Sequence, residues 1–328
     1  MTGIGIIGAG HFGAVHARAI AQVEGLEIVA VCREDAEAAA AFAAEHGGRV
    51  YVNWRDLLAD PRVDAVVIAT PHHLHRDVAI GAAEAGKHIL LEKPMAPSLA
   101  ECDDINAAVA RAGVHLMVGH VMHFALPCLK AKEIIASGAI GKPLVGSSAM
   151  VKFWMESNRR PWHLSKADGG GMLMTAGIHS LDRLVWLMGS DVVGVNALAG
   201  TFFHDQEADD TALIGLRFAD GGIGQVRSVG YREGVFDYSM ELQCENGALR
   251  LDFDSGIALS KGGKWVPVPD SIEPDWTHRA IIREWQALLA AIRGEAPVPV
   301  NGQYARHVVS IIDAVYRASD ERREVHPR

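Results

Sequence analysis

Cysteine is scarce in this chain of 328 residues, which contains four. Cys32, Cys102, Cys128 and Cys244 lie far apart and form no C-x-x-C pair. The sequence therefore predicts neither a disulfide framework nor a zinc site. We expect reduced thiols that are mostly buried.

Basic residues and long apolar runs are also few. The formal net charge is -9 at pH 7, whereas binding of phosphate groups needs clustered lysine and arginine. This argues against a general affinity for nucleic acid or for a membrane surface. No apolar run approaches the roughly 20 residues of a membrane span, and the N-terminus shows no basic leader with an apolar stretch behind it. A cytoplasmic protein is expected.

The first 120 residues alternate short runs of Val, Ile and Leu with longer Ala-rich stretches. Strands are predicted at 3–7, 26–31, 65–68, 88–91 and 115–119, and helices at 14–23, 36–45, 77–85 and 99–112. Apolar strands separated by helices are typical of a parallel sheet that is covered on both faces. We predict a doubly wound α/β domain at 1–122.

The pattern of predicted helices and strands changes in the second part of the chain. The apolar spacing from residue 173 onward predicts a helix that ends at Gly189. Strand-like runs follow at 192–202, 211–218, 223–230, 238–244 and 248–253, joined by turns such as "ADGG" and "ENG", and two helices close the chain. This order predicts a second α/β domain at 123–328 with a mostly antiparallel sheet. Its last helices could pack back on the first domain.

The segment "GIIGAGHFG" places Gly8, Gly10 and Gly13 in a G-x-G-x-x-G pattern between a strand and a helix. In such a turn the first glycine permits the tight bend, the second lets a pyrophosphate approach the backbone, and the third lets the helix pack closely on the strand. The phosphates then lie at the positive end of the helix dipole. The pattern predicts dinucleotide binding.

The tip of the second strand selects between the two nicotinamide cofactors. An acid there would bind the ribose hydroxyls of NAD, but the sequence has Arg33, whose charge suits the 2′-phosphate of NADP. Glu34 or Asp35 could still reach a ribose, and an arginine at this position can also be simply solvated. We expect NADP or NAD, with NADP slightly favoured.

The segment "KHILLEKPM" raises a question, because a buried strand ends in Glu92, Lys93 and Pro94. In open α/β sheets the ligand lies beyond the carboxyl ends of the strands. Lys93 should therefore face the reactive end of a nicotinamide, where an ammonium can donate to a substrate hydroxyl. The alternative is a salt bridge that only stabilises the strand end.

The segment "ATPHHLHRD" brings three histidines together after the preceding strand. It contains no thiol, and no acidic ligand stands among the histidines, so we favour cleft lining or helix capping over metal binding.

Together these residues resemble the Gfo/Idh/MocA family, the oxidoreductases related to glucose-fructose oxidoreductase and inositol 2-dehydrogenase. The matching motifs are the glycine fingerprint, "TPHHLH" in place of the usual T-P-N-x-x-H, "EKPMA", "GKP" at 141–143, and "GGG" followed by "GIHSLD". They cover nearly the whole chain in order and spacing. This set is specific for the family and not for a substrate.

The resemblance implies a Rossmann domain followed by an α/β domain with an open, largely antiparallel sheet, whose exposed face often mediates dimer or tetramer contacts. It implies that Lys93 is the catalytic lysine of the E-K-P motif, with a cis bond to Pro94 in many relatives. It also implies that His179 stands in the helix-borne D-x-x-x-H motif.

One departure from the family pattern affects the chemistry. Where many members carry the aspartate of that motif, this chain has Thr175, one helical turn before His179. A threonine can orient an imidazole but cannot stabilise an imidazolium. The change could weaken base catalysis, shift the burden to Lys93 or signal different chemistry. Asp182 could partly replace the carboxylate, although a role as a helix partner is the simpler expectation.

The expected contacts fall into two sets. Those with the cofactor are Gly8, Gly10, His11, Phe12, Gly13, Arg33, Thr70, Pro71, His75, Glu92 and Lys93. Those with the substrate are His120, His123, Trp162, His163 and His179. His120 and His123 follow the fifth strand, and Trp162 lies on a loop where it would suit the apolar face of a sugar ring.

The leading hypothesis is a reversible hydride transfer between a nicotinamide and a carbinol carbon of a sugar, cyclitol or dihydrodiol, without a metal. His179 would take or give the hydroxyl proton, and Lys93 would bind the same oxygen and relay the proton. One alternative is an enzyme with retained NAD that causes no net redox change. Another is a cofactor-binding regulatory protein without activity. A homodimer or homotetramer is expected.

Overall fold

The computed structural model describes all 328 residues, and their contacts divide the chain into two compact units. The first unit consists of residues 1–120 and 277–306, and the second of residues 121–276 and 307–328. Helix α8 (Trp276–Ile292) therefore belongs almost entirely to the first unit, although it comes late in the chain.

The first unit is built on a parallel sheet of six strands in the order β3-β2-β1-β4-β5-β6. The strands are β1 (Thr2–Ile7), β2 (Leu26–Cys32), β3 (Arg49–Tyr51), β4 (Ala65–Ile68), β5 (His88–Glu92) and β6 (Leu116–Gly119). Strands β4 and β6 are buried along their whole length, as expected where helices cover both faces. This is the Rossmann order, and the predicted doubly wound fold is confirmed. Its topological switch lies between β1 and β4.

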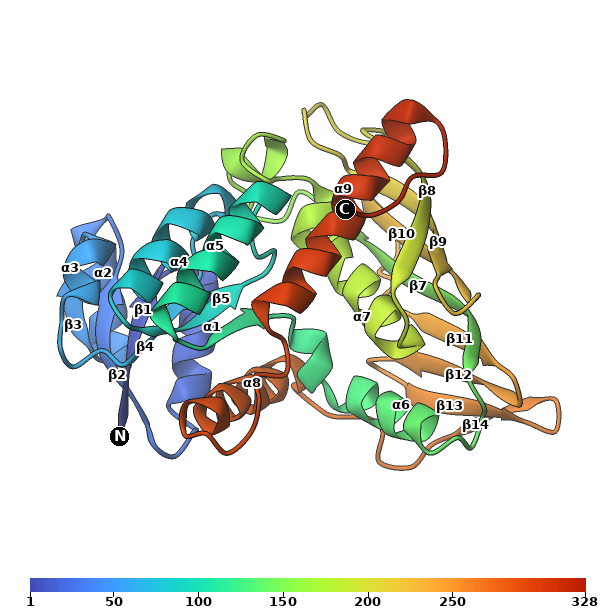
Figure 1. The fold of residues 1–328 in the computed structure, drawn as a ribbon, viewed down its shortest axis with the longest axis horizontal. Helices are drawn as coiled ribbons and strands as arrows, with labels where there is room; N and C mark the ends of the chain where they lie inside the picture. The colour runs from blue at the N-terminus through green and yellow to red at the C-terminus, as the bar shows by residue number, and fades with distance from the viewer. The chain divides into compact units, whose positions relative to one another are not determined.

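Five further helices belong to this unit: α1 (His11–Ile20), α2 (Ala36–His46), α3 (Trp54–Leu58), α4 (His75–Glu84) and α5 (Leu99–Ala112) (Figure 1). Local sequence sets their ends. Asp35 accepts hydrogen bonds from two backbone N–H groups at the start of α2. Ser98 and Glu101 form a capping box at the start of α5, which ends at Gly113 in a left-handed conformation.

The second unit contains a sheet of eight strands in the order β14-β13-β12-β11-β7-β10-β9-β8. All neighbours are antiparallel except β7 and β10, which lie side by side in parallel. The strands are β7 (Pro143–Phe153), β8 (Val192–Gly200), β9 (Thr211–Phe218), β10 (Ile223–Tyr231), β11 (Met240–Cys244), β12 (Gly247–Asp252), β13 (Gly256–Lys261) and β14 (Lys264–Pro267). The expected mostly antiparallel sheet is confirmed.

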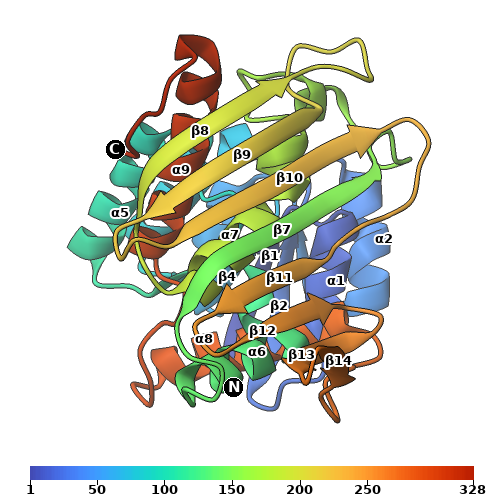
Figure 2. The ribbon, with the colours of Figure 1, turned by 90° about the vertical axis from the view of Figure 1, so that its right-hand side faces the viewer.

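One face of this sheet is covered by helices. Helix α7 (Ile178–Met188) packs on β7 and β10, and α6 (Leu126–Ala136) packs on β12 and β13. Glycine makes the close approach possible, because a Cβ atom at Gly146 would lie 2.5 Å from Leu184. Figure 2 shows the opposite face, across which the strands run without a helix in front of them. The last helix, α9 (Gly302–Glu321), starts in the first unit and continues into the second.

Several elements were not predicted, above all the central strand β7 and helix α6. All four cysteines are free, and three of them are buried. None of the helices is long and apolar enough to cross a membrane.

Candidate functional site

The glycine loop between β1 and α1 has the geometry of a phosphate-binding turn. Gly8 has a φ angle of +97°, and a Cβ atom there would lie 2.4 Å from the carbonyl oxygen of Ala69. A Cβ atom at Gly13 would lie 2.5 Å from the carbonyl oxygen of Gly8. Gly10, by contrast, caps α1 and has open space where a side chain would be. A pyrophosphate fits this space at the positive end of the helix.

The tip of β2 is tied to this loop. The carbonyl oxygen of Cys32 accepts hydrogen bonds from the N–H groups of Gly8 and Ala9, each at 3.1 Å. Arg33 is exposed, and its Nη1 donates to the carbonyl oxygen of Ala9 at 3.1 Å. His11 and Phe12 open helix α1 and are also exposed. These expected cofactor contacts therefore surround one turn of the backbone.

His75 connects two strand ends that carry expected cofactor contacts. Its Nδ1 lies 2.9 Å from the carbonyl oxygen of Pro94, and its Nε2 lies 3.0 Å from that of Thr70, which is followed by Pro71. Burial lowers the pKa of His75, although both carbonyl groups oppose this effect. A neutral imidazole has one N–H and can donate to only one of them. No group of three or more His, Cys, Asp or Glu side chains in the chain is arranged to hold a metal ion.

Lys93 directly follows β5, the strand that lies beside β4 in the sheet. Glu92 and Lys93 are each 9% exposed, and the Lys93–Pro94 peptide bond is cis, as the resemblance implied. The Glu92 carboxylate accepts a hydrogen bond from the backbone N–H of Lys93 at 3.2 Å and lies 2.9 Å from Nε2 of His16. Burial raises the pKa of Glu92, but the His16 hydrogen bond and the neighbouring Lys93 ammonium oppose burial, and the pKa is lowered overall. Glu92 is therefore a buried carboxylate.

In the second unit, Thr175 and His179 lie where a π-helical turn (Leu173–Gly177) leads into α7. Between residues 172 and 185 all residues except these two are buried. They share an accessible face of the helix, as their spacing predicts. π-Helical turns are rare and occur often at functional sites.

Asp209 fixes the start of this turn, a role that the sequence did not reveal. One carboxylate oxygen accepts from the N–H of Leu173 at 3.0 Å, and the other accepts from the hydroxyl of Tyr316 at 2.7 Å. Burial raises the pKa of Asp209 to about 6, against the opposing effect of both hydrogen bonds. The only local signal was the pair of acids in "EADDT" before a strand.

The remaining expected substrate contacts are mostly buried. In the first unit, His120 is fully buried, and its ring meets Tyr304 edge-on at 6.1 Å. In the second unit, Nε2 of His123 lies 3.0 Å from Asp182, and its ring stacks on Trp186. Asp182 thus pairs with His123 as a helix partner. This pairing favours a structural role for both residues.

Trp162 and His163 lie together on the loop before the π-helical turn. Their rings stack with centroids 3.6 Å apart, and Trp162 is half-buried. Nδ1 of His163 accepts from the backbone N–H of Arg160 at 3.0 Å, and its carbonyl oxygen accepts from Gly171 at 2.8 Å. The loop is thereby pinned to the glycine segment that precedes Thr175.

Comparison with known proteins covers both units. Residues 2–120 match an oxidoreductase family with an NAD-binding Rossmann fold, and residues 128–250 match the GFO/IDH/MocA C-terminal domain. The 2,7-anhydro-N-acetylneuraminate hydratase of Mediterraneibacter gnavus is 33% identical, over 99% of this chain and 96% of the relative. Inositol 2-dehydrogenase 1 of Saccharopolyspora erythraea is 30% identical, over 97% and 94%. The structure of levoglucosan dehydrogenase with NADH and levoglucosan has the same fold, with a TM-score of 0.90 over 99% of both chains at 24% identity.

Proposed function

The chain belongs to the GFO/IDH/MocA family of oxidoreductases, and from this premise we propose that it transfers a hydride between a nicotinamide and a carbinol or carbonyl carbon of a sugar, cyclitol or dihydrodiol. The observation that carries the proposal is the position of Lys93. It follows β5, which lies beside β4 and two places from β1 in the same parallel sheet. The carboxyl end of β1 bears the open glycine loop, so both features share one edge.

Different residues of the chain would bind the cofactor and transfer the proton. Gly8, Gly10 and Gly13 would hold the pyrophosphate at the start of α1, and the bound nicotinamide would supply the hydride acceptor or donor. In the oxidative direction the hydroxyl proton passes to His179, while Lys93 donates a hydrogen bond to the same oxygen and relays the proton. Thr175 would orient the His179 imidazole. Lys93 alone could fill both roles if His179 only positions the substrate.

NADP is the proposed cofactor. Arg33 is exposed at the tip of β2 and is held over the glycine loop by its hydrogen bond to Ala9. A guanidinium in this position can bind a 2′-phosphate with two hydrogen bonds. NAD is the alternative cofactor and is consistent with the family description.

A second function is favoured by one relative. The hydratase of Mediterraneibacter gnavus is 33% identical, and a hydratase adds or removes water without a net change of oxidation state. This chain could therefore retain NAD and return the hydride within one turnover. The third possibility, a regulatory protein without activity, has only Thr175 in its favour.

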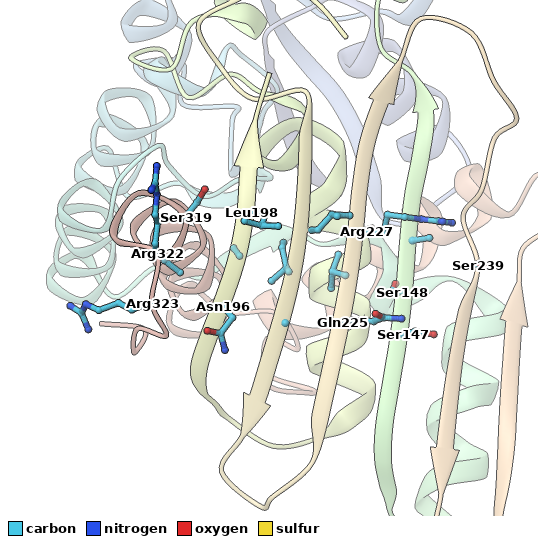
Figure 3. Close-up of a pocket in the computed structure, with 17 residues that line it drawn as sticks. Ser147, Ser148, Asn196, Leu198, Gln225, Arg227, Ser239, Ser319, Arg322 and Arg323 are labelled. Carbon is cyan, nitrogen blue, oxygen red and sulfur yellow. The ribbon is translucent and has the colours of Figure 1, made fainter. Parts of the chain in front are cut away.

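A homodimer or homotetramer formed through the open sheet face is part of the proposal. This face carries a hollow of about 940 Å³, lined by polar side chains that include Ser147, Asn196, Gln225 and Arg227 (Figure 3). Leu198 and Leu213 lie beside them and are 68% and 47% exposed. Exposed leucines on an uncovered sheet are typical of an interface.

A screen tests the function. Glucose, myo-inositol, levoglucosan and an aromatic dihydrodiol are each incubated with the protein and either NAD or NADP, and nicotinamide absorbance and product are followed. The proposal expects reduction of free cofactor by at least one substrate, faster with NADP. Product without any absorbance change supports retained cofactor. Cofactor binding with no conversion of a broad panel supports the regulatory alternative.

A further inference from the structure

A chain of three buried hydrogen bonds runs from helix α8 to Lys93. The indole Nε1 of Trp285 lies 3.1 Å from Nδ1 of His16, and Nε2 of His16 lies 2.9 Å from Oε1 of Glu92. Oε2 of Glu92 accepts from the backbone N–H of Lys93 at 3.2 Å. Trp285 is 1% exposed and His16 is fully buried, so no water competes for these groups. All four residues belong to the first unit.

The chemistry of the partners fixes the direction of each bond. An indole N–H can only donate, so Nδ1 of His16 must carry a lone pair. A neutral imidazole then carries its proton on Nε2, which donates to the Glu92 carboxylate. His16 is thereby held in one tautomer and one ring orientation. The arrangement resembles the way in which a hydrogen bond to the far nitrogen orients a catalytic or metal-bound imidazole.

The Glu92 carboxylate has little space to rotate. Its position against β6 depends on Gly119, where a Cβ atom would lie 3.3 Å from Oε1 and 3.4 Å from Oε2. Because Oε1 is bound by His16, Oε2 remains directed at the backbone of Lys93. A rotation of Glu92 would break both hydrogen bonds at once.

We propose that His16 is a positioning residue for Lys93, which acts by locking the Glu92 carboxylate at the root of the lysine, and that Trp285 selects the tautomer that makes this possible. The inference rests on the proposed function of Lys93. It gives the late helix α8 a role in the reaction.

The charges around Glu92 determine what loss of His16 should do. The titratable groups that act on this carboxylate are His16 on α1, Lys93 beside it, His75 on α4 and Glu284 on α8. Without the His16 donor, burial favours protonation of Glu92. A neutral Glu92 no longer stabilises the Lys93 ammonium, so the pKa of Lys93 should fall.

The tautomer is tested in the wild-type protein without a substrate. Nitrogen NMR of the histidine rings should show His16 protonated at Nε2 and unprotonated at Nδ1. A ring protonated at Nδ1, or at both nitrogens, overturns the proposal, because neither form can accept from Trp285.

Three variants test the positioning. Trp285→Phe removes the indole N–H and keeps an aromatic ring, His16→Leu removes both ring nitrogens, and His16→Gln restores a donor near the position of Nε2. Trp154→Phe is the matched control, because Trp154 is fully buried and also loses one indole hydrogen bond, to Gln206 at 2.8 Å, but lies in the second unit.

The backbone amide proton of Lys93 should exchange with solvent faster in Trp285→Phe and His16→Leu than in the wild type or the control, with His16→Gln between them. On the best substrate of the screen, kcat should fall by about 10-fold in His16→Leu, as for loss of other outer hydrogen-bond partners. The KM for the cofactor should not change, and the limb of the pH profile set by Lys93 should move to lower pH.

Unchanged exchange at Lys93 and an unchanged pH profile in the folded Trp285→Phe protein would overturn the proposal, even if His16→Leu fails to fold. Full turnover by Lys93→Met would contradict the proposed function instead. In that case the NMR and exchange measurements, which need no substrate, still decide whether the network holds Lys93.

Discussion

At the scale of single residues, Glu284 is a buried carboxyl group with one unpaired oxygen. Its side chain lies on α8, the residue is 1% exposed, and Oε1 is unpaired. Burial, reinforced by the charge of Glu92, raises the pKa of Glu284 well above its usual range. Burial therefore favours the protonated form of Glu284, whereas the pKa of the neighbouring Glu92 is lowered.

This contrast predicts opposite effects of two glutamine substitutions. Glu284→Gln should leave the free energy of unfolding at pH 8 unchanged or raise it, because an amide avoids the cost of ionising a buried group. Glu92→Gln should lower it by about 1 to 3 kcal/mol, because the amide –NH2 group replaces one carboxylate oxygen and faces an N–H donor that it cannot accept from. Urea unfolding measures both. A loss of more than about 1 kcal/mol in Glu284→Gln would contradict the neutral state.

Arg33 gives a prediction about cofactor choice. Arg33→Asp should weaken NADP binding by about 1.5 to 3 kcal/mol, the range for a hydrogen bond to a charged group, and should improve NAD binding. Titration calorimetry with both cofactors measures this, and Arg111→Asp on α5 is a control for the change in net charge. Equal affinities for NAD and NADP in the wild type, unchanged by Arg33→Asp, would rule out a 2′-phosphate clamp.

Sequence patterns predicted some of these functional residues but not others. The glycines of the loop and Lys93 were predicted because each belongs to a short motif with a local mechanical reason. His16 and Trp285 are separated by 269 positions, so no local pattern connects them. A buried histidine on an amphipathic helix shows in the sequence only as one polar residue on an apolar face.

At the scale of elements, the stability that Asp209 gives to the π-helical turn should depend on pH, because its carboxyl group titrates. In the unfolded chain Asp209 has its ordinary pKa of 3.8, whereas in the folded protein the pKa is about 6. Between these two pH values the folded protein keeps a proton on Asp209 that the unfolded chain has released. Stability from this group is therefore fully present below about pH 4 and is lost as the pH rises to about 6.

Asp209→Asn should remove this dependence. The wild type should lose on the order of 1 to 3 kcal/mol of unfolding free energy between pH 4 and pH 6 relative to Asp209→Asn. Asp191→Asn, at an exposed position before β8, should behave like the wild type. Denaturant unfolding at several pH values gives the comparison, and parallel curves for wild type and Asp209→Asn would show that the group does not titrate there.

The elements of the first unit were more predictable than those of the second. Buried parallel strands read as continuous apolar runs, and all five predicted strands lie within one residue of β1, β2, β4, β5 and β6 at both ends. Strand β7 escaped prediction because Gly146, Ser147 and Ser148 interrupt its apolar pattern, although it lies at the centre of the second sheet. The π-helical turn has no sequence signal distinct from that of an α-helix.

At the scale of the whole molecule, the open sheet face predicts assembly. Light scattering at micromolar concentration should give the mass of a dimer or tetramer. Leu198→Lys combined with Leu213→Lys should shift it toward the monomer, because desolvated lysines cannot be accommodated at an apolar contact. Val235→Lys, on the loop after β10 and 85% exposed, is a control outside the hollow. A monomeric wild type would contradict the proposed interface.

Lys93 is central to the proposed function, because the His16 network would hold it in place and the proposed chemistry uses its ammonium. The most direct measurement is the kcat of Lys93→Met on the substrate found in the screen, together with its Kd for the cofactor. The account predicts a kcat lower by about 10² to 10⁴, the span for a positioned acid or base, with cofactor affinity nearly unchanged. Full turnover by Lys93→Met would mean that the charged end of β5 is only a structural ion pair and that the proposed mechanism is wrong.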